Sequence, residues 1–217
     1  MKFKAILIDM DGTLTDTESI YQVNWVKAAR ELGYDFFTRE DALFLRSAWA
    51  PYAEEHFREK YGDKMDYDKL RCLCNDITAE ELKQIGVPLK PYAKEFLEAL
   101  KKTDLKIVLV SSTRMENVIK RLKETELYDY FEEIISAYTT KRGKPFPEPY
   151  LYACEVIGVD PKETIAVEDS PNGVMSAVSA GCNTIMVPDI TEADDELKAG
   201  LFGYAKDLME VLDIIEQ

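Results

Sequence analysis

Histidine and closely paired cysteines, the usual ligands of zinc, are scarce in this sequence. His56 is the single histidine, and the four cysteines at positions 72, 74, 154 and 182 contain no C-x-x-C pair. Zinc sites are built from such residues, so their shortage argues against a zinc protein. We therefore expect the cysteines to be reduced, structural thiols of a cytoplasmic protein.

Long apolar runs are also missing. The only uninterrupted apolar run before Asp9 covers residues 5–8, and no later segment approaches the ~20 apolar residues that a membrane-spanning helix needs. The run is also too short for the apolar region of a signal peptide. We therefore expect neither a signal peptide nor a membrane partner.

Positive charge is in short supply. The chain has 27 Lys and Arg against 41 Asp and Glu, which gives a net charge of −14. Such a charge repels the backbone of a nucleic acid and an anionic membrane surface, so we expect neither as a partner. A small ligand fits better, and a bound divalent cation can invert the field inside one pocket, so phosphate chemistry is not excluded.

The residues that are present are typical of a globular α/β protein. Hydrophobic residues make up 46% and charged residues 31% of the 217 residues, enough for one domain with a large insertion or for two small domains. Short runs rich in Val and Ile alternate with segments of helical periodicity, which predicts a parallel sheet wrapped by helices. The predicted strands cover residues 4–9, 106–111, 133–136, 164–168 and 184–188.

The segment 14–88 has a different character. It contains amphipathic helical text and no convincing strand, and it is much longer than the crossover that a parallel sheet requires. We read it as an inserted helical module, with a hinge at residues 86–92, where two prolines and a glycine occur. The remaining residues 1–13 and 89–217 would form the sheet domain, and residues 207–217 its last helix.

Two carboxylates follow the first predicted strand. Asp9 and Asp11 stand at its carboxyl end, with Gly12 to turn the chain. Ligands of open α/β sheets bind at that edge, and a charge buried there is costly unless it is paired or bound to a metal. The alternative is an Asp-Gly turn in which Thr13 caps a helix.

The second polar group follows a later strand, and the third lies in a proline-rich loop. Ser111 ends the strand KIVLVS and Ser112 follows it. Hydroxyls and free backbone amides there suit phosphoryl oxygens, although Ser111 could equally cap the following helix. Lys144 lies among prolines at 145, 147 and 149, which limit where its ammonium group can point. A lysine there could neutralise a phosphate or a carboxylate, or simply be solvated at the surface.

A fourth group, Glu168 and Asp169, ends the strand TIAVE. Paired acids at a strand end suggest a site for a hard cation with oxygen ligands. The alternative is that they complement the dipole of the following helix and need no metal.

Together the segments DMDGT, VSS, GKPFPEP and VEDSPNG, in this order, resemble the haloacid dehalogenase-like phosphotransferases, in particular the beta-phosphoglucomutase and phosphoglycolate phosphatase group. The resemblance implies a Rossmann-like parallel sheet core with an inserted all-helical cap domain at 14–88. It implies that Asp9 is a nucleophile and Asp11 a general acid and base. Ser111, Ser112 and Lys144 would bind phosphate, and Glu168 and Asp169 would bind Mg²⁺ with Asp9 and the backbone carbonyl of Asp11.

The chemistry agrees with these residue types. An anionic aspartate that attacks an anionic phosphate needs a cation to offset the repulsion, and Mg²⁺ suits an all-oxygen site. The cap would then select the substrate. Its candidate pocket residues all lie on the first two cap segments, although aromatic residues one helical turn apart are also typical of packing. They are Tyr21, Asn24, Trp25, Arg46, Ser47 and Trp49.

Two features rank the possible activities. In the beta-phosphoglucomutase pattern a histidine follows the Asp-Thr pair of the first cap helix, but Tyr21 stands there, and the family's cap arginine is not clearly matched in FLRSAWAP. We therefore expect a phosphatase of a small phosphate monoester, such as a sugar phosphate, in a monomer or weak homodimer. A sugar phosphomutase ranks second. A 2-haloacid dehalogenase, which usually lacks an equivalent of Asp11, and a non-catalytic phosphate-binding protein rank lower.

Overall fold

A computed structural model describes residues 2–216 of the chain. Two residues lie outside the described range. They are Met1, the first residue of the predicted sheet domain, and Gln217, the last residue of that domain and of the predicted last helix. The strands are β1 (Ala5–Ile8), β2 (Lys106–Ser111), β3 (Glu133–Ser136), β4 (Thr164–Glu168), β5 (Asn183–Met186) and β6 (Gly203–Tyr204). The helices are α1 (Glu18–Glu31), α2 (Arg39–Phe44), α3 (Ala50–Tyr61), α4 (Tyr67–Ile85), α5 (Ala93–Leu100), α6 (Met115–Glu124), α7 (Glu148–Ile157), α8 (Pro171–Ser179), α9 (Asp195–Ala199) and α10 (Leu208–Glu216).

The six strands form one parallel sheet in the order β3-β2-β1-β4-β5-β6. Strand β1 lies between β2 and β4, and its last residue, Ile8, is paired with Leu109 and Val167. Because all strands run the same way, their carboxyl ends meet at one edge of the sheet. This register brings the polar residues after β1, β2 and β4 close together.

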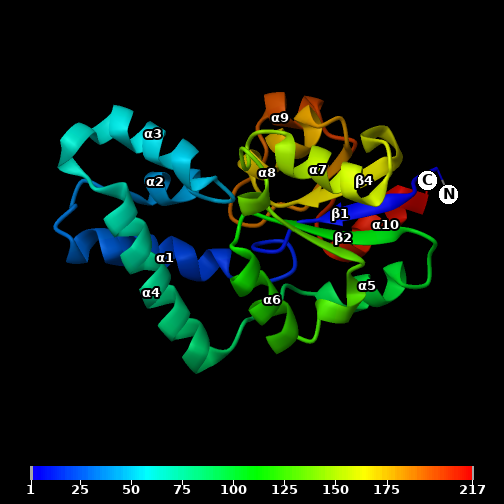
Figure 1. Ribbon diagram of the computed structural model, residues 1–217, viewed down its shortest axis with the longest axis horizontal. Helices are drawn as coiled ribbons and strands as arrows, with labels where there is room; N and C mark the ends of the chain where they lie inside the picture. Colours follow the sequence, from blue (N-terminus) through cyan, green and yellow to red (C-terminus); the bar gives the residue numbers. More distant parts are fainter. Residues whose placement is uncertain (1, 217) are drawn as a thin grey trace.

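Alternating side chains of the buried strands enter two hydrophobic cores, as the two-residue period of a strand requires. Ile6 and Ile8 join the core formed with α5, α6 and α10. Ala5 and Leu7 point to the opposite face, where they pack with residues of α7 and α8. The sheet is thus covered on both faces, the arrangement expected for parallel strands (Figure 1).

Helices α1 to α4 form a separate block beside the sheet, called the helical block below (Figure 1). The block has its own core, in which the rings of Trp25 and Tyr67 stack with centroids 6.3 Å apart and those of Phe57 and Tyr67 lie 5.7 Å apart. No strand occurs between residues 14 and 88. The division of the chain into domains at residues 13/14 and 88/89 stays a prediction.

The two chain segments that lead into and out of the helical block lie side by side. The Asp16 amide donates to the carbonyl of Pro88 at 2.8 Å, and the Lys90 amide donates to that of Leu14 at 2.9 Å. An antiparallel bridge joins Thr15 and Leu89 between them. The predicted hinge at residues 86–92 is therefore part of a paired connection.

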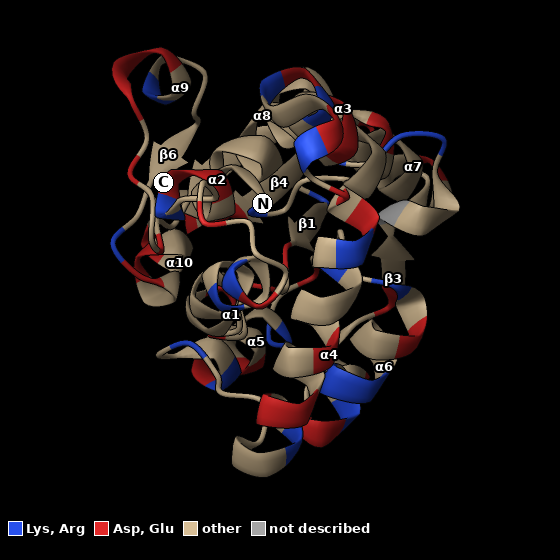
Figure 2. Ribbon diagram, turned by 90° about the vertical axis from the view of Figure 1, so that its left-hand side faces the viewer, with Lys and Arg blue, Asp and Glu red and all other residues tan. Residues whose placement is uncertain are grey.

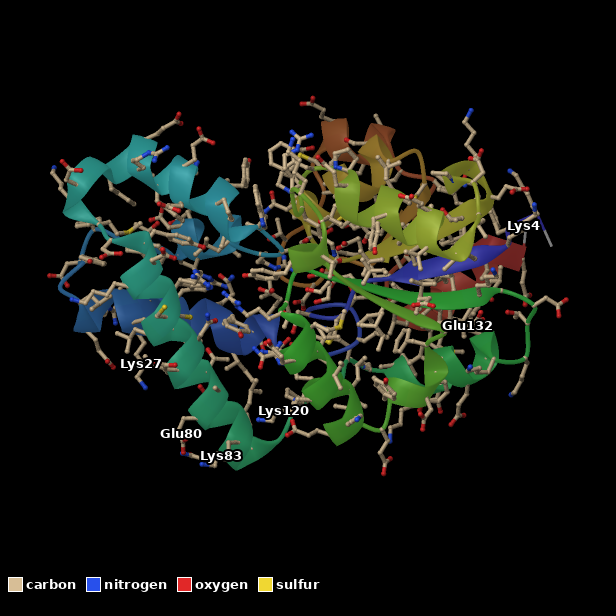
Figure 3. The ribbon with its side chains drawn as sticks, viewed as in Figure 1. Lys4, Lys27, Glu80, Lys83, Lys120 and Glu132 are labelled. Carbon is tan, nitrogen blue, oxygen red and sulfur yellow. The ribbon has the colours of Figure 1, made fainter. Side chains whose placement is uncertain are left out.

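Charged residues lie on the helices and loops around the sheet (Figure 2), and several of their side chains extend outward, such as those of Lys27, Lys83 and Lys120 (Figure 3). The acidic excess is visible around α9, where Asp194, Asp195 and Glu196 are consecutive. None of the helices within residues 2–216 combines the length and the apolar character needed to cross a bilayer. The four cysteines are free thiols, and Cys72 alone among them is exposed.

The predicted α/β class and the Rossmann-like parallel sheet are confirmed. The bounds of β2, β3 and β4 are as predicted, β1 and β5 differ by one or two residues at their ends, and the last helix begins at Leu208. Strand β6 was not predicted, since it has only two residues, Gly203 and Tyr204.

Candidate active site

Asp9, Glu168 and Asp169 form a buried acidic cluster at the carboxyl edge of the sheet. Oxygen atoms of the three carboxylates all lie within 4.8 Å of one another. Asp9 directly follows β1, where its amide donates to the Val167 carbonyl at 3.0 Å, and the other two acids end β4 and begin the turn after it. The sequence prediction that these acids converge is matched by this geometry.

Two glycines make room for the cluster. A Cβ atom at Gly12 would come within 2.1 Å of Asp169 Oδ2, and one at Gly173 within 2.0 Å of Glu168 Oε2. Gly12 also has a φ of +93°, a backbone conformation that favours glycine. Any larger residue at either position would displace a carboxylate of the cluster.

Burial perturbs these carboxyl groups. It raises the pKa of Asp9 well above its ordinary value, an effect that the neighbouring Lys144 opposes and the other two acids reinforce. Burial likewise raises the pKa of Asp169, against the lowering effect of Arg46. Among the described residues, Asp9 Oδ2 and Asp169 Oδ1 have no hydrogen-bond partner. Three close carboxylates, two of which have an unpartnered oxygen, are a donor set that fits a hard divalent cation.

Lys144 is the main counter-charge of the cluster. Its fully buried ammonium group donates to Asp9 Oδ1 at 2.5 Å, Glu168 Oε1 at 2.6 Å and the Val110 carbonyl at 2.9 Å. Burial lowers the pKa of Lys144, but the carboxylates of Asp9 and Glu168 outweigh burial and raise it above its ordinary value. The alternative of a solvated surface lysine is wrong.

Asp11 lies apart from the acidic cluster in a different set of contacts. Thr17 Oγ1 and Arg121 Nη1 donate to its Oδ1, each at 2.5 Å, and Thr113 Oγ1 donates to its Oδ2 at 2.8 Å. Its predicted metal contact through the backbone carbonyl stays a prediction. The Asp11 carboxylate is therefore surrounded by hydroxyl groups and paired with a guanidinium group.

The two serines after β2 hold local contacts. The buried Ser111 Oγ accepts from the Thr113 amide at 3.0 Å, and Ser112 Oγ donates to the Ser47 carbonyl at 2.8 Å. The alternative that Ser111 caps α6 is wrong, because the N-cap position is Arg114 and has no side-chain capping bond. The alternative that Thr13 caps a helix is also wrong, since α1 begins after Thr17.

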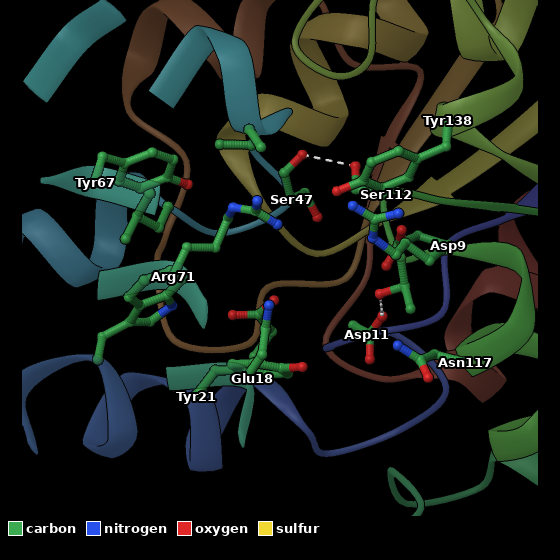
Figure 4. A pocket seen from close by; sticks show the side chains of 17 residues that line it. Asp9, Asp11, Glu18, Tyr21, Ser47, Tyr67, Arg71, Ser112, Asn117 and Tyr138 are labelled. Atoms are coloured by element: carbon green, nitrogen blue, oxygen red, sulfur yellow. Dashed lines mark hydrogen bonds between the residues drawn. The ribbon is translucent and has the colours of Figure 1, made fainter. Parts of the chain in front are cut away.

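A pocket of about 140 Å³ opens between the strand ends and the helical block (Figure 4). Both Asp9 and Asp11 line it, and the block contributes aromatic, polar and cationic side chains. The pocket is lined by Asp9, Asp11, Glu18, Tyr21, Trp25, Leu45, Ser47, Ala48, Ala50, Tyr67, Arg71, Asn75, Ser112, Thr113, Arg114, Asn117 and Tyr138. The site therefore combines two aspartates of the sheet edge with a mixed surface from α1 and α4.

The structure divides the six candidate cap residues into two groups. Tyr21, Trp25 and Ser47 line the pocket, and Trp25 also packs on Tyr67. Asn24 and Trp49 do not line the pocket. Asn24 donates to Thr78 and Glu81 within the helical block, and the ring of Trp49 meets Phe146 edge-on.

Arg46, the sixth candidate, is fully buried beside the acidic cluster. Its Nη2 atom pairs with Asp169 and lies 3.5 Å from Asp189 Oδ2, and its Nε lies 3.8 Å from Glu18 Oε2. The alternative of an exposed arginine is wrong. Burial raises the pKa of Glu18 to about 8, although Arg46 lowers it.

Sequence reasoning missed Arg121, which binds Asp11. Burial lowers the pKa of its guanidinium, but Asp11 and Tyr21 raise it to a value above the ordinary one. A signal was present, because Arg121 lies three residues after Val118 and one before Leu122, on the buried face of the amphipathic α6. An arginine on an apolar helix face requires a buried partner. The pattern does not reveal which partner it has.

The model of the haloacid dehalogenase-like hydrolase family matches residues 6–187. The chain belongs to this family. The predicted membership of this family and the prediction that the chain is an enzyme are confirmed.

Relatives and solved structures agree with that assignment. The chain is 29% identical over 227 residues to a phosphorylated carbohydrates phosphatase of Thermotoga maritima, with 99% of each chain covered. It is 30% identical over 200 residues to hexitol phosphatase A of Escherichia coli, covering 89% of this chain and 90% of the other. A structure from Bacteroides vulgatus, provisionally described as a beta-phosphoglucomutase, matches with a TM-score of 0.79 and 25% identity over 99% of this chain and 88% of that one.

Proposed function

We propose that this enzyme is a magnesium-dependent phosphatase that hydrolyses a small phosphate monoester, such as a sugar phosphate, through an aspartyl-phosphate intermediate. The observation that carries the proposal is the state of the Asp9 carboxylate. One of its oxygens is held by Lys144, while the other, Oδ2, has no partner among the described residues, and Asp9 lines the pocket. The phosphatase activities named for the two relatives support it.

In the first step, the free oxygen of Asp9 attacks the phosphorus atom, and the bond from phosphorus to the ester oxygen breaks. The leaving alcohol takes a proton from Asp11. Lys144 keeps its proton and holds the attacking carboxylate in place through Oδ1. In the second step, water attacks the phosphoryl group, gives a proton to Asp11, and the bond to Asp9 breaks to release inorganic phosphate.

Asp9, Glu168 and Asp169 would hold the magnesium ion. When bound, the ion would neutralise the charge that develops on the phosphoryl oxygens. Without it the three acids would repel an anionic substrate, and Lys144 alone supplies one positive charge at Asp9 and Glu168. The cytoplasmic location, the predicted phosphate contacts of Ser111, Ser112 and Lys144, and a monomeric or weakly dimeric state stay predictions.

A phosphate-release assay on a panel of sugar phosphates, with Mg²⁺ or with excess EDTA, tests the proposal. We expect release from at least one sugar phosphate, loss of turnover in EDTA and recovery when Mg²⁺ is added back. Turnover that is unchanged in EDTA would contradict the metal assignment. No phosphate release from any member of the panel would contradict the proposed activity.

A sugar phosphomutase is the second candidate, favoured by the description of the Bacteroides vulgatus structure and by polar pocket residues such as Asn75 and Asn117. A mutase must hold a sugar in two orientations and exclude water. Phosphorus NMR with beta-glucose 1-phosphate and a trace of bisphosphate separates the two. We expect inorganic phosphate as the main product, and isomerisation that outruns release by about a hundredfold, or ~2.7 kcal/mol in competing barriers, would reverse the ranking.

A further inference from the structure

Arg121 is a buried cation that the proposed chemistry does not use. It does not line the pocket, yet its two side-chain hydrogen bonds to other described residues go to residues that do. Nη1 donates to Asp11 Oδ1 at 2.5 Å, and Nη2 donates to the Tyr21 hydroxyl at 2.9 Å. The side chains of Arg121 and Asp11 are only 9% and 10% exposed.

The pair with Asp11 restricts that carboxylate. Among the described residues, Arg121 is the one cation that forms an ion pair with Asp11, and the other two donors are the hydroxyl groups of Thr17 and Thr113. A guanidinium group is planar and offers its donors in a fixed fork, so its position limits the rotation of a bound carboxylate. Removal of Arg121 would leave Asp11 with two hydroxyl donors that can rotate.

The second hydrogen bond crosses between two parts of the fold. Arg121 belongs to α6, which packs on the sheet, whereas Tyr21 belongs to α1 of the helical block. The guanidinium carbon lies 5.7 Å from the centre of the Tyr21 ring, so the contact includes the ring face. The same guanidinium thus touches the sheet-edge aspartate and the helical block.

We propose that Arg121 is a positioning residue, which fixes the orientation of the Asp11 carboxylate at the pocket and, through the Tyr21 hydroxyl, couples that orientation to the placement of α1. The proposal rests on the proposed function, in which Asp11 gives a proton to the leaving alcohol as the bond between phosphorus and oxygen breaks. Arg121 keeps its own protons throughout. The loss of activity on substitution of Arg121 should therefore be larger for a leaving group that needs a proton than for one that does not.

Two esters with different leaving groups test this directly. p-Nitrophenyl phosphate releases a stable phenolate that needs little protonation, whereas a sugar phosphate releases an alkoxide that needs a proton. Because kcat/KM covers only the steps up to departure of the alcohol, it leaves out the hydrolysis of the phosphoenzyme, which both esters share. The sugar phosphate should be the one that the wild type hydrolyses fastest in the panel above.

We expect Arg121→Gln to lower kcat/KM by about a hundredfold for the sugar phosphate and by less than about fivefold for the aryl ester, within the usual range of general acid catalysis. Arg121→Lys keeps a buried cation and should recover part of the loss, with a decrease of about tenfold for the sugar phosphate. Lys120→Gln is the matched control on the same helix, since Lys120 is exposed (Figure 3), and should leave both values unchanged.

Tyr21→Phe keeps the ring and the pair between Arg121 and Asp11 but removes the hydroxyl. We expect a decrease of about fivefold that again affects mainly the sugar phosphate, and no further decrease when the change is added to Arg121→Gln. Thermal unfolding of each variant shows whether it folds. If Arg121→Gln does not fold, Arg121→Lys and Tyr21→Phe still give the ratio of the two esters.

Equal losses on both esters would assign Arg121 a structural role only and overturn the inference, as would folded Arg121 variants with unchanged kcat/KM. These results leave the proposed function intact, because the wild type would still hydrolyse both esters. A wild type that hydrolyses neither ester would overturn the proposed function and this inference with it.

Discussion

The two aspartates on either side of Met10 lie in contrasting surroundings. Asp9 belongs to an acidic cluster, with one oxygen on Lys144 and the other without a partner among the described residues. Asp11 has no acid of that cluster as its partner and accepts three hydrogen bonds, from Arg121, Thr17 and Thr113. An oxygen without a partner suits a nucleophile. A carboxylate that three hydrogen bonds hold in one orientation suits a group that exchanges protons with the substrate.

The largest effect should come from Asp9→Asn. The amide keeps the size of the side chain but is a poor nucleophile, so we expect turnover to fall below detection while the fold is retained. Phosphate release and circular dichroism check the two halves of this prediction. Normal turnover in the folded variant would show that another group attacks phosphorus.

A smaller effect is expected for Asp11→Asn. It should slow turnover by a factor of about 10² to 10⁴, because Asp9 can still attack phosphorus in the proposed mechanism but proton transfer from Asp11 is lost. Steady-state kinetics should show the decrease in kcat, with KM nearly unchanged. A variant with normal kcat and weakened binding would remove the contrast between the two aspartates.

The smallest effect is expected in the helical block. Arg71 lines the pocket and pairs with Asp68 at 2.9 Å, whereas the ion pairs of Asp9 and Asp11 among the described residues are with Lys144 and Arg121. Arg71→Gln should raise KM for the sugar phosphate by less than about tenfold and leave kcat within about twofold. Lys69→Gln, an exposed change on the same helix, is the control. A large loss of kcat in Arg71→Gln would mean that the block takes part in the chemical step.

The strand ends could be predicted from sequence because each combines a local apolar run with a polar residue directly after it. Asp9, Ser111 and Glu168 are examples, and parallel pairing alone brings them to one edge. Lys144 was singled out by a different signal, the prolines around it, which limit where its ammonium group can point. The three acceptors of its ammonium group, on Asp9, Glu168 and the backbone of Val110, are given only by the structure.

Contacts between residues far apart in the chain could not be predicted in this way. Arg46 follows no strand, and its partner Asp169 lies 123 positions later, so only the folded chain brings them together. Arg121 and Asp11 are 110 positions apart, and Arg121 and Tyr21 are 100 apart. Trp25 fits both readings of an aromatic stripe, since it packs on Tyr67 and lines the pocket.

Trapping of the phosphoenzyme tests the central claim most directly. Asp11→Asn should form the aspartyl phosphate from p-nitrophenyl phosphate and hydrolyse it slowly, so that acid quenching during turnover preserves it for peptide mass spectrometry. The account predicts one added phosphoryl group on the peptide that contains Asp9, and none after the further change Asp9→Asn. A phosphoryl group on another residue, or none on a variant that still releases p-nitrophenol and phosphate, would contradict it.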